Sequence, residues 1–258
     1  MPSGGLDIAV SIHEPRQSSA TGIILCPGFL DSRRYEHMVS LADGFAGAGC
    51  VAARLDTGGI WDSSGDESYY SISRYLRDIA TVEAYLRKQC GVTSLLIGGH
   101  SMGGFVSLVY GASADVRGVI ALCPPKQMLS TSVPDWQKKG IRISDRDLPD
   151  GSGNRTYRVP WAFAVDSSQY SALEAVKQYD DLPLYLMAAG HDAVVPPDEV
   201  MALYAAAHEP KRMVVFDDMP HDIRKDAQHS AIVTASVIDW SRAQELLPAD
   251  GYGTIAVA

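Results

Sequence analysis

A short glycine-rich segment in the first half of the chain has the spacing of a catalytic turn. Gly99-His100-Ser101-Met102-Gly103-Gly104 lies between an apolar run at 94–98 and a helical pattern at 102–112. The order G-x-S-x-G between a strand and a helix predicts a serine on a tight, strained turn, whose small neighbours leave room for both elements. The following helix directs its N-terminus toward this serine, where a developing negative charge is stabilised. We therefore predict that Ser101 is a nucleophile.

The acid of such a site is expected after a later strand. A serine hydroxyl is a weak nucleophile and needs a base that an acid orients, in the chain order serine, acid, histidine. Asp192 directly follows the apolar run at 184–188, at the carboxyl end of a predicted strand, and we predict that it is the acid. Three other aspartates precede this run or begin a helix, where capping is the simpler role: they are Asp180, Asp181 and Asp198.

The base is expected in the loop after the last strand. His221 follows the predicted strand at 212–216, and we predict that it accepts the proton of the serine. His229 is the alternative, but it falls inside the amphipathic pattern at 222–240 rather than at a strand end. His191 lies beside the predicted acid on the same turn, where a surface role is expected.

The oxyanion of the reaction requires two backbone donors. The Met102 N–H at the start of the helix is one. The run at 23–26 leads into Pro27-Gly28-Phe29-Leu30, and we predict that the Phe29 N–H is the second. Gly28 would let the backbone approach a substrate, and we count it together with His100 as substrate-binding. A simple Pro-Gly turn is the alternative for this segment.

Regular alternation of short apolar runs and amphipathic stretches predicts an α/β fold with a mostly parallel central sheet flanked by helices. The runs are apolar on both faces, as parallel strands between helices require; they lie at 22–26, 50–54, 94–98, 118–123, 184–188 and 212–216. An alternating piece at 6–12 predicts an antiparallel edge strand. Helices are predicted at 34–47, 71–90, 102–112, 198–208 and 222–240.

One segment departs from this alternation. Residues 124–180 are punctuated by prolines and contain a strong loop signal at 150–154. A structureless loop of this length is uncommon in a compact domain, so we predict an inserted lid within a single domain spanning residues 1–258. Its large aromatic residues are predicted to bind substrate; they are Trp136, Trp161 and Phe163. The alternative is that these rings only fasten the insertion to the core.

The residues together resemble the α/β-hydrolase superfamily. The resemblance runs from about residue 6 to residue 240 and rests on the 99–104 turn followed by Asp192 and His221. Arg54-Leu55-Asp56-Thr57-Gly58-Gly59 and Ser63-Ser64-Gly65-Asp66 are similar to a stretch of its feruloyl/cinnamoyl-esterase-like and monoglyceride-lipase-like branches. The resemblance implies serine-ester chemistry, the same two oxyanion donors, and an insertion that borders the acyl pocket.

Composition restricts the other possibilities. The formal charge of −9 disfavours binding to nucleic acid, and no apolar run is long enough to span a bilayer. The N-terminus has no secretory pattern and the four cysteines no C-x-x-C spacing, so we expect a cytoplasmic monomer or homodimer with reduced cysteines. Serine chemistry requires no metal and no organic cofactor.

The predicted function is hydrolysis of small-molecule carboxylic esters with small to medium acyl or aromatic groups. Serine at position 101, where a related enzyme class has aspartate, argues against dehalogenase or epoxide-hydrolase chemistry. Three alternatives stay open: a thioesterase, an aminopeptidase-like hydrolase, and a non-catalytic small-molecule binder on the same fold.

Overall fold

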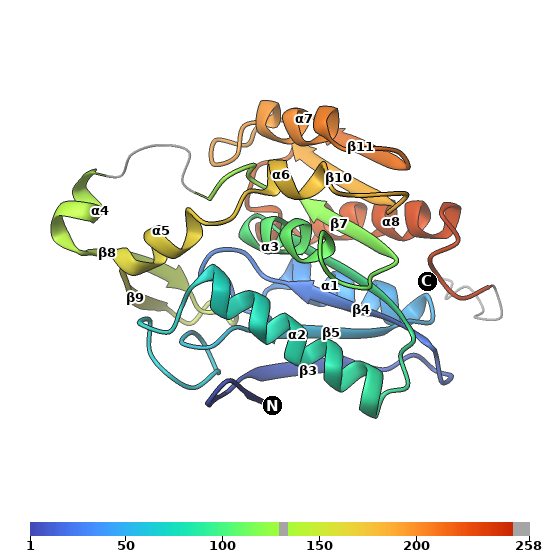
Figure 1. Ribbon diagram of the computed structural model, residues 1–258, viewed down its shortest axis with the longest axis horizontal. Helices are drawn as coiled ribbons and strands as arrows, with labels where there is room; N and C mark the ends of the chain where they lie inside the picture. Colours follow the sequence, from blue (N-terminus) through green and yellow to red (C-terminus); the bar gives the residue numbers. More distant parts are fainter. Residues whose placement is uncertain (129–133, 250–258) are drawn as a thin grey trace.

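The apolar runs of the sequence form a central sheet, and the amphipathic segments form helices on both of its faces (Figure 1). The computed structural model describes residues 1–128 and 134–249. Residues 129–133 of the predicted lid and residues 250–258 of the predicted single domain lie outside the described residues.

The strands within the described residues are β1 (Pro2–Ser3), β2 (Leu6–Asp7), β3 (Ala9–His13), β4 (Thr21–Cys26), β5 (Val51–Asp56), β6 (Ser94–His100), β7 (Gly118–Leu122), β8 (Ile141–Asp147), β9 (Asn154–Pro160), β10 (Leu184–Ala189) and β11 (Lys211–Phe216). The central sheet has the order β11-β10-β7-β6-β4-β5-β3. Its strands are parallel except β3, which pairs antiparallel with β5 at the edge. The predicted fold class, including the antiparallel edge strand, is confirmed.

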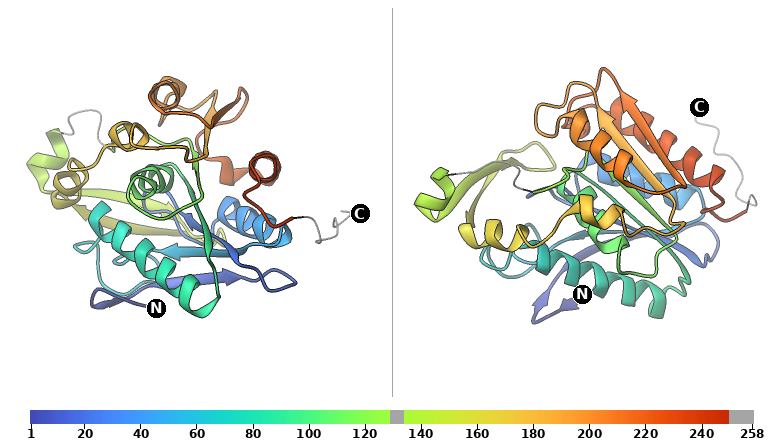
Figure 2. Two further views of the ribbon diagram at one scale, coloured as in Figure 1. Left: turned by 45° about the vertical axis from the view of Figure 1, so that its right-hand side comes forward. Right: turned by 45° about the horizontal axis from the view of Figure 1, so that its top comes forward.

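The helices of the same residues are α1 (Glu36–Gly47), α2 (Ile72–Gln89), α3 (Met102–Gly111), α4 (Pro134–Lys139), α5 (Trp161–Ser167), α6 (Ala172–Val176), α7 (Pro197–Ala206), the 3-10 turn η1 (Ile223–Lys225) and α8 (Ala227–Ala243). Helices α1 and α8 lie together on one side of the sheet, and α2 and α3 lie on the other (Figure 2). The sheet is thus covered on both faces, as its apolar strands require.

Each face of the sheet has its own hydrophobic core. Successive residues of β4 alternate between the two: Ile23 and Leu25 pack with α1 and α8, whereas Ile24 packs with α2 and α3. Phe45 of α1 and Phe105 of α3 are fully buried in the respective cores. The alternation fixes which side chains of each strand meet which helical layer.

Residues of the predicted lid form an inserted unit of α4, the antiparallel hairpin β8-β9, and α5, which extends from one end of the molecule (Figure 1). Trp136, Tyr157 and Phe163 of this unit are buried in the same core as α2 and α3. Helix α6, in the last part of the predicted lid, packs instead against α3 and α7 as part of the helical layer. The structure therefore contains an insertion at the predicted place, and its role as a lid stays a prediction.

The last helix begins later than the sequence pattern predicts. Residues 222–226 form η1 and a turn, and α8 starts only at Ala227, where the Asp226 side chain accepts the Gln228 N–H. An aspartate at this position satisfies one of the free N–H groups of the first helical turn. The segment after β11 therefore leaves the sheet as a loop before it becomes helical.

Helix α3 packs unusually close to the end of β4. A Cβ atom at Gly103, in its first turn, would overlap the Cys26 carbonyl oxygen, and a Cβ atom at Gly99 would overlap the same oxygen. Only residues without side chains permit this approach, so the glycines of the 99–104 turn are required by packing between a strand and a helix.

We expect Gly103→Ala to lower the free energy of unfolding by about 3 kcal/mol or more, because the methyl group meets backbone that cannot move aside. Gly47→Ala is the matched control: it lies at the exposed end of α1 with open space around it and should be neutral or stabilise by up to about 1 kcal/mol. Denaturant unfolding of both variants measures the difference, and equal stabilities would contradict the packing argument.

Candidate active site

Ser101 is the residue between β6 and α3, and its backbone is strained. Its φ of 56° and ψ of −120° lie outside the regions that L-residues ordinarily adopt. Its N–H donates to the Leu122 carbonyl at 2.7 Å, which holds the turn against β7. Strained residues of this kind persist where the surrounding structure fixes them, and they occur frequently at active sites.

Three side chains that are far apart in the sequence form one hydrogen-bond chain. His221 Nε2 lies 2.9 Å from Ser101 Oγ, and His221 Nδ1 lies 2.6 Å from Asp192 Oδ2. The ends of β6, β10 and β11 position the three residues, because parallel strands end at the same edge of the sheet. This arrangement lets the imidazole accept the serine proton while the carboxylate orients it.

The Asp192 carboxylate is held in its ionised form. Burial alone would raise its pKa, but the hydrogen bond from His221 and those from the Val195 and Val194 N–H groups outweigh burial, and the pKa is lowered. The two N–H groups donate to Oδ1 at 2.7 and 2.8 Å, which leaves Oδ2 for the histidine. With an ionised partner, His221 carries its proton on Nδ1, and Nε2 is free to accept.

The alternative acids and bases lie elsewhere. His229 is in the first turn of α8 with Nε2 3.8 Å from Asp226 Oδ2, and His191 is exposed. Asp180 and Asp181 precede β10, and Asp198 is in the first turn of α7. None of them takes part in the hydrogen bonds around Ser101.

Two tyrosines fix the predicted oxyanion loop. The Tyr70 hydroxyl accepts the Leu30 N–H at 2.8 Å, and the Tyr75 hydroxyl donates to the Pro27 carbonyl at 3.0 Å. Leu30 has a φ of 56°, so the chain turns sharply directly after Phe29. Across from this loop, Met102 is the first residue of α3, where an N–H has no partner within the helix.

His100 forms a hydrogen bond with the backbone of His221. Its Nε2 lies 2.9 Å from the His221 carbonyl oxygen, and burial together with the nearby His221 lowers the pKa of His100 to about 3. The ring is therefore neutral at physiological pH and donates this hydrogen bond. Burial, followed by His100, also lowers the pKa of His37, whose ring lies edge-on at 5.0 Å from that of His100.

Among residues 1–128 and 134–249, two groups bring three potential metal ligands within 4.8 Å of one another. Both ring nitrogens of His221 are hydrogen-bonded to Ser101 and Asp192, so the group that contains His221 is not a candidate metal site. The remaining group offers one carboxylate and two imidazoles and is the place where a cation would find donors; its members are Asp31, His37 and His100. It supplies no step of the serine chemistry.

A cavity of about 280 Å³ lies at this edge of the sheet and contains Ser101 and His221. Its walls come from the oxyanion loop, the insertion and the loops after β10 and β11; the lining residues are Phe29, Asp31, His100, Ser101, Pro125, Gln127, Met128, Trp136, Arg142, Arg146, Phe163, Val194, Val195, Glu199, His221 and Asp222. Of the predicted substrate-binding residues, this wall includes His100, Trp136 and Phe163. Gly28 and Trp161 are not part of it, and Trp161 packs edge-on against Trp136 at 5.8 Å.

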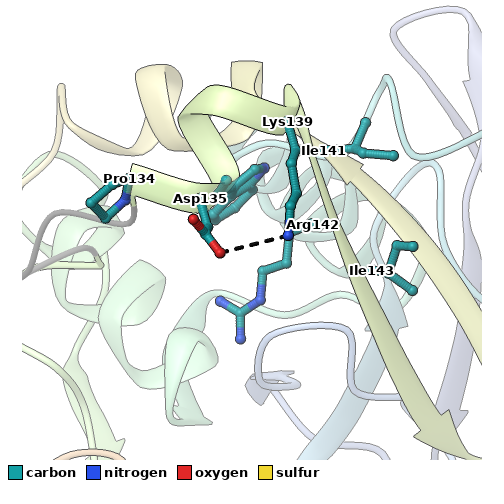
Figure 3. A pocket seen from close by; sticks show the side chains of 7 residues that line it. Pro134, Asp135, Lys139, Ile141, Arg142 and Ile143 are labelled. Atoms are coloured by element: carbon teal, nitrogen blue, oxygen red, sulfur yellow. Dashed lines mark ion pairs between the residues drawn. The ribbon is translucent and has the colours of Figure 1, made fainter.

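A second hollow of about 810 Å³ lies on the insertion itself (Figure 3). It is larger than the cavity described above but does not contain Ser101 or His221. Trp136 and Arg142 line both spaces. The smaller cavity is therefore the candidate site, and its outer wall is shared with the larger hollow.

Arginines that sequence reasoning missed connect the insertion to the site. Arg146 of β8 donates to the Phe29 carbonyl at 2.8 and 3.2 Å, and Arg155 of β9 donates to the Trp61 carbonyl at 2.8 Å. Arg224 of η1 donates to both carboxylate oxygens of Asp147 at 2.6 and 2.8 Å, and this hydrogen bonding lowers the pKa of Asp147 to about 2. The period-2 alternation of residues 142–146 is a signal in the sequence that places Arg146 on the same strand face as Arg142.

The stretch at 54–66, which supported the resemblance, is structural. Asp56 is buried and accepts the Arg33 N–H at 2.7 Å, and Ser63 Oγ donates to the Asp56 carbonyl at 2.6 Å. The segment therefore fixes the loop beside the oxyanion segment without entering the cavity.

The sequence matches the family model Hydrolase_4, described as serine aminopeptidase, S33, over residues 17–169. This is more than half of the chain. The chain belongs to this family of hydrolases. Comparison with curated proteins gave no match for this hydrolase.

Solved structures share the fold of this hydrolase. Est1E from Butyrivibrio proteoclasticus with bound ferulic acid is 19% identical, with a TM-score of 0.75 over 95% of this chain and 98% of that chain. The mouse α/β-hydrolase domain-containing protein 10 is 16% identical, with a TM-score of 0.74 over 94% and 97% of the two chains. XC6422 from Xanthomonas campestris, described as a serine hydrolase without lid, is 18% identical, with a TM-score of 0.64 over 95% and 90%. These likenesses show the α/β-hydrolase fold.

None of the helices in the described residues of this hydrolase has the length and apolar character needed to cross a membrane.

The position of the base is testable by labelling with a fluorophosphonate, which reacts with an activated serine. We expect His221→Ala to slow labelling by about 10²- to 10⁴-fold, because the hydroxyl then has no proton acceptor. His229→Ala is the matched control and should label within about twofold of the parent protein. The reverse pattern would place the base in α8.

Proposed function

We propose that this hydrolase cleaves carboxylic esters of small to medium acyl or aromatic groups through an acyl-enzyme on Ser101. The observation that carries the proposal is the hydrogen-bond chain from Ser101 through His221 to Asp192 at a strained strand–helix turn. The lowered pKa of Asp192 supports the proposal, because an ionised carboxylate accepts the Nδ1 proton of His221 and leaves Nε2 facing Ser101 Oγ.

The first step of the proposed reaction is attack of Ser101 Oγ on the ester carbonyl while its proton moves to His221 Nε2. Asp192 stabilises the resulting imidazolium, which then protonates the departing alcohol. Water, activated by the same histidine, hydrolyses the acyl-enzyme and regenerates the serine. The proposed steps use the side chains of Ser101, His221 and Asp192 and one water molecule.

The charge that develops on the carbonyl oxygen is assigned to the N–H groups of Phe29 and Met102. The Met102 N–H belongs to a helix N-terminus, where the helix dipole also favours negative charge. Hydrogen bonds of the Phe29 carbonyl and of the Leu30 N–H support this assignment, because they fix the peptide that directly follows Phe29 before substrate binds.

The size and lining of the cavity support acyl groups of modest size. A volume of about 280 Å³ is at the lower end for small-molecule sites. Phe29 and Phe163 meet edge-on at 5.2 Å, and Phe163 stacks on Tyr70 at 5.1 Å. The rings of Phe29 and Phe163, which line the cavity, offer flat apolar surface for an aliphatic or aromatic acyl chain.

A panel of substrates with a common acyl group tests the reaction class. The aryl ester, the matching thioester and the amino-acid amide should be compared by kcat/KM, because the family description includes aminopeptidases. We expect the ester to be preferred. A preference for the thioester or the amide would replace the ester assignment while leaving the nucleophile unchanged.

Removal of the nucleophile tests the role of Ser101. Ser101→Ala should leave a folded protein whose kcat for an aryl ester is at least about a thousandfold lower, because nucleophile and base act as a unit. Circular dichroism and thermal unfolding serve as folding controls. Parent-like turnover in this variant would exclude the serine mechanism.

Substitutions in the aromatic wall of the cavity test its role in substrate selectivity. Trp136→Ala and Phe163→Ala should change the relative kcat/KM values of short, long and aromatic esters by about 5- to 150-fold, and so change their ranking. This factor is the equivalent of about 1–3 kcal/mol of apolar contact. Turnover of an aryl acetate should stay within about tenfold, because a small acyl group barely reaches these rings.

Trp161→Ala is the control for that series, since Trp161 lies outside the cavity wall. It should preserve the ranking. If Trp136→Ala and Phe163→Ala also keep the parent ranking and only lower the thermal stability, the insertion is structural packing and the lid interpretation is wrong.

A further inference from the structure

The inner face of the inserted hairpin carries three arginines, and two of them have fixed tasks. In the antiparallel register Arg142 pairs with Val159 and Arg146 with Arg155, so these side chains share one face of the hairpin with the buried Val159. Arg146 and Arg155 each donate to a backbone carbonyl of a neighbouring loop. Arg142 is the third and has no such acceptor among the described residues.

The Arg142 guanidinium is nevertheless held in place. It lies 5.4 Å from the centre of the Phe29 ring and 5.7 Å from that of Trp136, both of which line the cavity. In Figure 3 the Asp135 carboxylate beside it is paired with Lys139, at 3.6 Å. Residues 129–133, outside the described part of the chain, contain no acidic side chain. Aromatic contacts orient this cation without neutralising it.

Among the described residues, none of the three carboxylates that line the cavity forms an ion pair with Arg142. Asp31 Oδ1 lies 3.9 Å from Arg146 Nε. Asp222 forms ion pairs with Arg224 and Lys225 at 3.9 and 3.5 Å, and Glu199 accepts the Lys126 N–H at 3.1 Å. Burial, and after it the neighbouring Arg146, lowers the pKa of Arg142, as expected for two like charges that share one wall. An anion placed there would relieve this repulsion.

We propose that Arg142 binds a carboxylate of the substrate, so that the preferred esters of this enzyme carry a negative charge. This inference rests on the proposed function and assigns its substrate class. The guanidinium lines the same cavity as Ser101 and His221, so a substrate can contact Arg142 while its ester carbonyl lies at the serine. A planar guanidinium matches a carboxylate with two parallel hydrogen bonds.

The test uses two pairs of esters that differ in one charge. In the first pair the carboxylate is on the acyl side: 4-nitrophenyl hemiglutarate is compared with 4-nitrophenyl valerate. In the second it is on the leaving group: 4-acetoxybenzoate is compared with its methyl ester. The readout for each pair is the ratio of kcat/KM for the anionic ester to kcat/KM for the neutral ester.

In the parent enzyme we expect this ratio to exceed about 10 in at least one pair and to fall as salt is added, since a partly exposed ion pair is screened. Arg142→Gln should lower that ratio about 10- to 100-fold, and Arg142→Lys should lower it less, because a lysine retains the charge without the planar fork. The pair that responds shows which side of the ester carries the carboxylate.

Arg158→Gln is the matched control. Arg158 is on the same hairpin but on its opposite face, paired with the exposed Ile143, so its loss changes the net charge equally. Its ratio should remain that of the parent. Ratios near 1 in both pairs, or equal ratios in the Arg142→Gln and Arg158→Gln variants, would overturn the proposal.

A second readout separates this proposal from the ester assignment. Glutarate should slow fluorophosphonate labelling of the parent enzyme at concentrations about tenfold lower than are needed for Arg142→Gln. Protection without ester turnover would leave the anion site in place and overturn the ester function. Hydrolysis of neutral esters, with neither glutarate protection nor a preference for anionic esters, would support the ester function and overturn the anion site.

Discussion

The site depends on how closely α3 approaches the end of β4. Because Gly99 and Gly103 have no side chains, the helix starts directly against the Cys26 carbonyl, and the chain between β6 and α3 must turn within one residue. That residue is Ser101, whose positive φ projects the hydroxyl from the sheet edge toward the loops after β10 and β11. The same approach brings the N-terminus of α3 to the cavity. Strain at one residue is thus maintained by packing that involves only backbone.

Around this edge of the sheet, hydrogen bonds and ion pairs hold the surrounding loops in place. The inserted hairpin anchors two of them through Arg146 and Arg155, and η1 anchors the hairpin through the Arg224–Asp147 pair. The ionised form of Asp147 is favoured in the folded protein, so this contribution is fully present above the usual aspartate pKa and is lost only as the pH falls toward 2. His100 adds a neutral donor behind His221. The insertion therefore supports the geometry of the serine site in addition to forming its wall.

The sequence predicts the parts of this structure that follow from local pattern. Apolar runs identify the strands, and the order of Ser101, Asp192 and His221 follows from their places after strands of one parallel sheet. The arrangement of the insertion does not follow, because it depends on the register between β8 and β9 and on contacts between segments about a hundred residues apart. The sequence therefore does not predict that Arg142 and Arg146 line the cavity. It predicts Trp161 as a substrate-binding residue, whereas in the structure the neighbouring Trp136 lines the cavity and Trp161 does not. The predicted start of the last helix, at residue 222, is too early, because its N-terminal cap, Asp226, lies inside the amphipathic pattern.

The proposed mechanism requires that Ser101 carries the acyl group of the substrate during turnover. Its most direct test is mass spectrometry of the enzyme quenched in acid within milliseconds of mixing with a slowly deacylating aryl ester. We expect one added acyl mass on the intact protein, located on the peptide that contains Ser101 and absent from Ser101→Ala. Ester turnover with no acylated species, or with the acyl group on another residue, would contradict it.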